Sequence, residues 1–215
     1  MKNALAILLL LLTAGAAQAQ TNEKFVQAME KTLAGLDTLK TAEDWQTKSN
    51  AFERIAQKET KEWLPQYYVA LCQTMIFNFE KDAAKQEALT NKAEQYIAQA
   101  DSLMPNNSEV YVVRSMVTSL RIRLNPMVNG PKYGMMASMY LQKSKTLDPS
   151  NPRAYTQEGI STYFTPEQWG GSKEKGKALL ETADLKYEAF KPASTIAPSW
   201  GKAANDYILK MAKKG

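Results

Sequence analysis

The side chains in this sequence that could do chemistry are mainly cationic. Arg114 and Arg121 are seven residues apart, so on one helix they would share a face, and Lys132 follows in the next segment. Two guanidinium groups and an ammonium group in this arrangement could bind a phosphate or a carboxylate. A solvated basic helix face has the same spacing and is the simpler interpretation.

A second cationic group follows a pair of glycines and suggests a phosphate cradle. Lys173, Lys175 and Lys177 come soon after Gly170-Gly171. However, the G-x-x-x-x-G-K-[ST] spacing of a phosphate-binding loop is absent. We therefore interpret the segment as a capped helix start. Trp169 lies directly before the two glycines. It is either buried, packing the turn against the helices, or exposed, where it would contact a binding partner.

Residue types for catalysis and metal binding are scarce. The 215 residues include no histidine, which removes the usual general base near neutral pH, the common nucleophile pairs and the commonest zinc ligand. Cys72 is the only cysteine, so no intrachain disulfide can form, and its setting predicts a buried packing residue. The carboxylates have no spacing that specifies a metal or an acid/base pair. We expect no enzymatic activity, no metal and no cofactor.

The first residues have the pattern of a secretory signal peptide. An apolar run from Ala4 to Leu12 precedes Ala17-Gln18-Ala19, the motif that a signal peptidase reads. We therefore expect residues 1–19 to be removed and the protein to be exported to the periplasm or the medium. The apolar run is shorter than the roughly 18 residues that span a bilayer, so no transmembrane segment is expected in the mature chain. No cysteine lies near the cleavage point, so a lipoprotein is not expected.

Composition is that of a globular protein with a modest positive charge. Apolar residues make up 44% of the chain and charged residues 23%, and the formal net charge is +5. Because this small excess is scattered along the sequence, we expect no nucleic-acid partner.

Apolar residues recur at helical spacing along almost the whole chain. One stripe consists of Leu89, Ala93, Ile97, Ala100 and Met104. No stretch alternates with the period of two that a half-buried strand would have. The pattern therefore predicts an all-α fold.

A large aromatic residue followed four positions later by a small one occurs three times, at intervals of 43 and 44 residues. The pairs are Tyr68 and Cys72, Tyr111 and Ser115, and Tyr155 and Gly159. The two positions lie one turn apart on one helix face, and the small residue lets a partner helix approach closely. Each pair therefore indicates the first helix of a helix pair.

The second helices repeat in the same way, and together the two patterns resemble the tetratricopeptide repeat (TPR) family. Ala93, Ile97, Ala100 and Pro105 have the same relative spacing as Ala137, Leu141, Ser144 and Pro149. The family unit reads W-x2-L-G-x2-Y, then A-x3-F and a terminal proline. Trp200, Ala203, Ala204 and Tyr207 match its first half. The chain is similar in particular to secreted bacterial members carrying the segments Asn125-Pro126-Met127, Lys132-Tyr133-Gly134 and Gly170-Gly171-Ser172-Lys173.

The resemblance implies an α-α superhelix, a TPR-like solenoid, forming one domain over residues 20–215. We expect a divergent helix pair at 20–62, helix-pair units at 63–107, 108–151 and 152–197, and a C-terminal capping helix at 198–212. The family unit has about 34 residues, so these units are longer. We place the extra length in loops between paired helices, at Asn78–Thr90, Asn125–Gly134 and Thr165–Gly171.

Folds of this kind usually bind extended partners on a long concave face. The resemblance therefore implies an exported, non-catalytic protein-binding scaffold, although the sequence names neither the partner nor the oligomeric state. If the three loops gather on one edge, the candidate contact residues are Lys132, Tyr133, Trp169 and Lys173. The alternative function is a soluble periplasmic carrier for a small anionic molecule, bound in a pocket near Arg114, Arg121 and Trp169.

Overall fold

The computed structural model describes residues 23–213, and within that range the chain is helical and contains no strand. The predicted all-α fold is therefore confirmed. Residues 23–33 form the first helical segment described. The following elements are η1 (Leu36–Thr38), α2 (Ala42–Lys58), α3 (Trp63–Phe77), α4 (Ala83–Leu103), α5 (Ser108–Leu124), α6 (Pro126–Leu147), α7 (Pro152–Phe164), η2 (Glu167–Trp169), α8 (Lys173–Ala189) and α9 (Lys202–Ala212). The predicted signal peptide, residues 1–19, lies outside the described residues.

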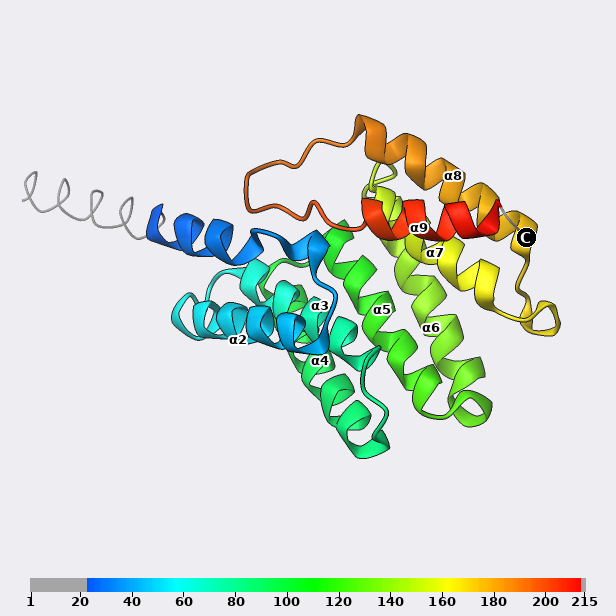
Figure 1. Cartoon of the computed structure of the whole chain (residues 1–215), viewed down its shortest axis with the longest axis horizontal. Helices are drawn as coiled ribbons and strands as arrows, with labels where there is room; N and C mark the ends of the chain where they lie inside the picture. The colour runs from blue at the N-terminus through cyan, green and yellow to red at the C-terminus, as the bar shows by residue number, and fades with distance from the viewer. Residues whose placement is uncertain (1–22, 214–215) are drawn as a thin grey trace, which may run out of the picture.

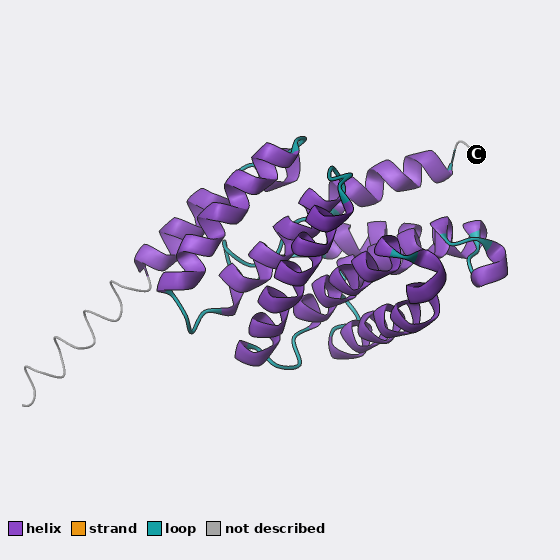
Figure 2. Cartoon of the chain, turned by 90° about the horizontal axis from the view of Figure 1, so that it is seen from below, coloured by secondary structure: helices purple, strands orange, loops and turns teal. Residues whose placement is uncertain are grey.

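Helices that follow one another in the sequence pack side by side. The most extensive contacts join α5 to α6, α7 to α8 and α3 to α4, and the first helices of successive pairs, α3, α5 and α7, also contact one another. Figures 1 and 2 show the resulting row of helix pairs between the N-terminal and C-terminal helices. Within residues 23–213, no helix is both long enough and apolar enough to cross a bilayer.

The small residues of the repeated pattern lie between packed helices. Cys72 and Ser115 are buried, and the Ser115 hydroxyl donates a hydrogen bond to the Ala137 carbonyl at 2.8 Å, which joins α5 to α6. A Cβ added at Gly159 would lie 2.9 Å from Cγ of Leu180 on α8. The spacing therefore predicted the close helix approaches correctly.

Helix ends follow the capping residues in the sequence. The backbone amides of Asp44 and Lys175 donate to the hydroxyls of Thr41 and Ser172, at 3.1 and 3.2 Å. Capping of this kind satisfies amide groups that lack partners inside the helix. The segment between α7 and α8, predicted as a loop, contains the single short turn η2.

Two of the three predicted loops are largely helical, so the extra length of the units was misplaced. α4 begins at Ala83, and α6 begins at Pro126 and continues through Pro131. The side chains of Asp82 and Asn125 cap these helices, and Pro126 occupies a first-turn position where its missing amide hydrogen costs little. Packing of α6 along α5 outweighs the local preference of its glycines and prolines. The extra residues lengthen the second helices.

A buried polar cluster ties the C-terminal segment to earlier helices. The fully buried guanidinium of Arg153 donates to both carboxylate oxygens of Glu109, at 2.7 and 2.6 Å, and to the Trp200 carbonyl at 3.2 Å. The Trp200 indole donates to the Tyr67 hydroxyl at 2.8 Å. As residues at signature positions of the repeat, Trp200 and Tyr207 are both predicted to pack in the core. Trp200 is a core residue, but Tyr207 is 69% exposed, so the prediction is wrong for Tyr207: α9 buries Asn205, Leu209 and Ala212 on its other face.

Candidate functional site

The arginines predicted as binding residues join α5 to its neighbours. Arg114 forms an ion pair with Asp101 of α4, and its guanidinium lies 4.9 Å from the ring centroid of Tyr140 on α6. Arg121 Nε donates to Glu94 of α4 at 2.7 Å, and this hydrogen bond raises the pKa of Arg121. Both guanidinium groups are therefore already paired with carboxylates.

The other four predicted residues are distributed over separate elements. Lys132 and Tyr133 lie on α6, with the ammonium 5.1 Å from the ring centroid. Trp169 is 61% exposed in η2, so it is not buried, and Lys173 is exposed at the start of α8. Within residues 23–213, no hydrogen bond, ion pair or ring contact joins Trp169 or Lys173 to the candidates on α5 and α6. The structure does not assemble the six residues into one site.

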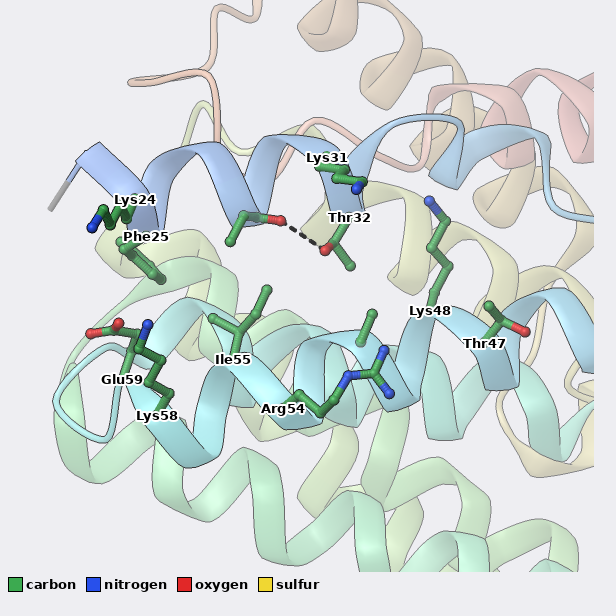
Figure 3. Close-up of a pocket in the computed structure, with 12 residues that line it drawn as sticks. Lys24, Phe25, Lys31, Thr32, Thr47, Lys48, Arg54, Ile55, Lys58 and Glu59 are labelled. Atoms are coloured by element: carbon green, nitrogen blue, oxygen red, sulfur yellow. Dashed lines mark hydrogen bonds between the residues drawn. The ribbon is translucent and has the colours of Figure 1, made fainter. Parts of the chain in front are cut away.

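A groove of about 450 Å³ lies instead between the helical residues 23–33 and α2. Figure 3 shows the side chains that line it. Its apolar lining comes from Phe25, Ala28, Ala51 and Ile55. A volume in this range, with apolar walls and a few polar groups, is typical of sites for small molecules.

The groove follows from the spacing of residues on its two helices. Lys24, Ala28 and Lys31 share one face of the first helix, while α2 presents a matching stripe in which Ala51 lies one turn from Ile55. Alanine side chains end at Cβ, so the facing positions leave space that larger residues would fill. The same spacing places cationic side chains along the edges of an apolar depression.

Positive charge dominates the groove. Its lining includes the cationic side chains of Lys24, Lys31, Lys48, Arg54 and Lys58. Glu59 is the single carboxylate among its lining residues. Lys48 Nζ donates to the Ala34 carbonyl at 2.6 Å. In the described part of the chain, no carboxylate lies within ion-pair distance of the other four cations. Since like charges repel, an anion bound here would relieve an unfavourable arrangement.

A second depression, of about 420 Å³, lies where α2, α3 and α4 meet. Its polar lining consists of uncharged groups, including Gln57, Gln66, Tyr96 and Gln99. Such a lining offers no opposite charge to an anion. The groove along residues 23–33 is therefore the better candidate for a charged ligand.

The residues described in the structure show no preassembled metal site or reactive thiol in the groove. Its cations face one carboxylate, and the described residues contain no cluster of histidine, cysteine, aspartate or glutamate that could hold a metal ion. Cys72 is fully buried in the core, and burial raises the pKa of its thiol. A thiol held protonated in this way is a poor nucleophile.

The fold and the groove define an all-α protein with a cationic, apolar-walled groove on its N-terminal helices. No protein-family model matches the chain, and no curated protein shows significant similarity to it. The solved structure of the HusA haemophore from Porphyromonas gingivalis is similar, with a TM-score of 0.77 and 31% sequence identity over 88% of this chain and 93% of HusA. The chain belongs to the same family as HusA.

Sequence reasoning missed the groove because it followed the repeat signature, which fades before Tyr68. A signal was nevertheless present. Lys24 and Lys31 are separated by seven residues with Ala28 between them, and Arg54 and Lys58 follow Ala51 at helical spacing. Two adjacent helices that each carry cations around a central alanine indicate a basic groove.

Proposed function

We propose that this protein is a carrier for haem or a related tetrapyrrole, bound in the groove between residues 23–33 and α2. Two observations support the proposal. The similar protein HusA is described as a haemophore, a protein that carries haem. The groove combines apolar walls with cationic edges.

The chemistry of a tetrapyrrole matches this combination. Its ring is flat and largely apolar, and haem carries two propionate groups on one edge. Phe25 and Ile55 offer apolar contacts to the ring, whereas Arg54 and the lysines offer charge-assisted hydrogen bonds to carboxylates. The observation that carries the proposal is the presence of both kinds of surface in one groove.

The ligand would be held by its ring face and its carboxylates. Proteins usually bind haem iron through histidine, cysteine, methionine or tyrosine. The chain has no histidine, Cys72 is buried, and none of these residue types lines the groove. Binding in the groove should therefore depend little on the metal.

A protein-binding scaffold, the function implied by the resemblance to TPR proteins, has less support. Two of the three loops expected to form its recognition edge are helical, and the similarity to a haemophore favours a carrier. A carrier requires no catalytic activity. Export through the signal peptide predicted at residues 1–19 is part of the proposal.

Filling the groove tests the proposed function directly. Ala51→Phe adds bulk to the lining of the groove without changing charge, so we expect the affinity for haemin to fall by about tenfold or more. Titration followed by the haem absorption band and by quenching of tryptophan fluorescence measures this change. Metal-free protoporphyrin should bind the native chain with similar affinity.

Ala178→Phe is the matched control, because Ala178 is exposed on α8, outside the groove. Melting curves of both variants show whether each remains folded. If the native chain binds neither haemin nor protoporphyrin, the proposed function is wrong. Binding that survives Ala51→Phe unchanged places the ligand elsewhere on the protein.

A further inference from the structure

We propose that the groove has a direction: it binds both carboxylates of its ligand at the end formed by Lys31, Lys48 and Arg54, and the apolar edge of the ring at the opposite end. This inference rests on the proposed function and deepens it by assigning the orientation of the ligand. It follows from the unequal distribution of charge along the groove (Figure 3).

The two helices that form the groove run in opposite directions, so each end combines the start of one with the end of the other. Figure 3 shows Lys31 and Thr32 facing Lys48 and Thr47 at one end. At the other end, Lys24 and Phe25 lie near Lys58 and Glu59. Arg54 and Ile55 lie between the two ends, and the Arg54 guanidinium points toward the end with Lys31 and Lys48.

The first end is suited to carboxylates. Lys31, Lys48 and Arg54 supply three positive charges, with no acidic residue among the groove residues at this end. The Thr32 hydroxyl donates to the Ala28 carbonyl at 2.8 Å, so the cations are the donors for a carboxylate there. The hydrogen bond from Lys48 to the Ala34 carbonyl holds that ammonium in place before a ligand arrives. A guanidinium such as that of Arg54 can bind a carboxylate through two parallel hydrogen bonds.

The opposite end is suited to the apolar edge. There, the carboxylate of Glu59 offsets part of the charge of Lys24 and Lys58 and would repel a ligand carboxylate. Phe25 is 5% exposed, so its ring is firmly packed and forms a fixed part of the wall. A ring turned end for end would place its propionates beside Glu59 and leave the cations of the first end without partners.

Two double variants with the same loss of charge test the direction. The first variant, Lys31→Gln with Arg54→Gln, removes two cations from the end proposed to bind the carboxylates. The second, Lys24→Gln with Lys58→Gln, removes two cations from the opposite end. None of these four side chains forms a hydrogen bond or ion pair with another side chain in residues 23–213, so both variants should fold. Lys48 is left intact because it contacts the backbone.

Each variant is titrated with protoporphyrin and with its dimethyl ester, which lacks the negative charges. We expect the Lys31 and Arg54 variant to lose about tenfold or more in affinity for the diacid, and the Lys24 and Lys58 variant to lose less than about threefold. The dimethyl ester should bind the native chain and both variants alike.

Equal losses in the two variants, or a larger loss for Lys24 and Lys58, would overturn the proposed direction. So would a preference of the ester for one variant. These results are distinct from failure of the proposed function, which shows as absence of porphyrin binding to the native chain or as binding insensitive to Ala51→Phe. Circular dichroism induced in the absorption band of the bound porphyrin provides a second readout. A porphyrin bound in one orientation should give a defined signal with the native chain, and this signal should be weaker with the Lys31→Gln, Arg54→Gln variant.

Discussion

Two regions of this protein, the buried cluster around Arg153 and the groove, contain positive charge but differ in how the cations are paired. In the buried cluster, the guanidinium of Arg153 has a carboxylate, a carbonyl and two aromatic rings, those of Phe190 and Trp200, as neighbours. In the groove, Lys24, Lys31, Arg54 and Lys58 face apolar side chains and one another. The first arrangement pairs its cation within the protein, whereas in the described part of the chain these four groove cations have no carboxylate within ion-pair distance.

The contrast separates a buried charge, which requires a counter-charge inside the protein, from exposed charges, which do not. Taking a guanidinium out of water is costly, so Arg153 can be buried only because Glu109 pairs with it through two hydrogen bonds. Exposed cations have no such requirement, since water solvates them. Their clustering around an apolar groove therefore contributes little to folding, and under the proposed function these cations would bind the carboxylates of the ligand.

The largest effect is expected from breaking the buried pair. Glu109→Gln leaves the Arg153 charge buried without its counter-charge, so the free energy of unfolding should fall by about 3 kcal/mol or more. Urea unfolding followed by circular dichroism measures the change. Porphyrin affinity of the folded fraction should stay the same, because Glu109 does not line the groove.

The matched control for Glu109→Gln is Asp184→Asn. Asp184 pairs with Lys202 at 3.0 Å, and both side chains are substantially exposed. Exposed pairs contribute at most about 1 kcal/mol, so this variant should be nearly as stable as the native protein. Equal destabilisation by the two substitutions would contradict the conclusion that the buried Glu109–Arg153 pair contributes more to stability than the exposed Asp184–Lys202 pair.

A medium effect is expected from salt, which should act on the groove and not on the buried cluster. Raising sodium chloride from about 0.05 M to about 1 M shortens the screening length from above 10 Å to about 3 Å, so affinity for protoporphyrin should fall by about fivefold. Fluorescence titration at each salt concentration measures it. The Lys31→Gln, Arg54→Gln variant should show a weaker dependence; an unchanged dependence would contradict a role for these cations.

The smallest effect is expected at η2, the exposed aromatic position that sequence reasoning singled out. Because the Trp169 side chain is mostly in solvent, Trp169→Ser should change the free energy of unfolding by less than about 0.5 kcal/mol. Porphyrin affinity should also stay within experimental error of the native value. A clear loss of affinity would move the binding site toward η2 and away from the groove.

Much of the fold could be predicted because its determinants are local. Thr41, Asn151 and Ser172 fix helix starts, and Cys72, Ser115 and Gly159 mark where helices approach closely. These signals depend on residues one or two turns apart. The resemblance to the TPR family itself stays a prediction, since the chain is related to HusA and matches no family model.

What could not be predicted depends on contacts between distant segments. The glycines and prolines between Pro126 and Gly134 predict a loop, yet the segment is helical because α6 packs along α5. Arg114 and Arg121 read as available cations, yet α4 supplies Asp101 and Glu94 to pair with them. The groove was missed for a related reason: the spacing of its cations is present in the sequence, but whether Lys31 and Lys48 lie at the same end depends on how the two helices pack against each other.

The return of residues 190–201 across the molecule bears on how the architecture could change. Figure 1 shows this segment running from α8 back toward the first helices, where the Tyr68 hydroxyl donates to the Ile196 carbonyl at 3.5 Å and Trp200 contacts Tyr67. An open array of repeats can gain or lose a unit and keep its remaining neighbours intact. Here an inserted or deleted helix pair would move Trp200 away from Tyr67 and break their hydrogen bond. The segment therefore couples the stability of the fold to the number of helix pairs.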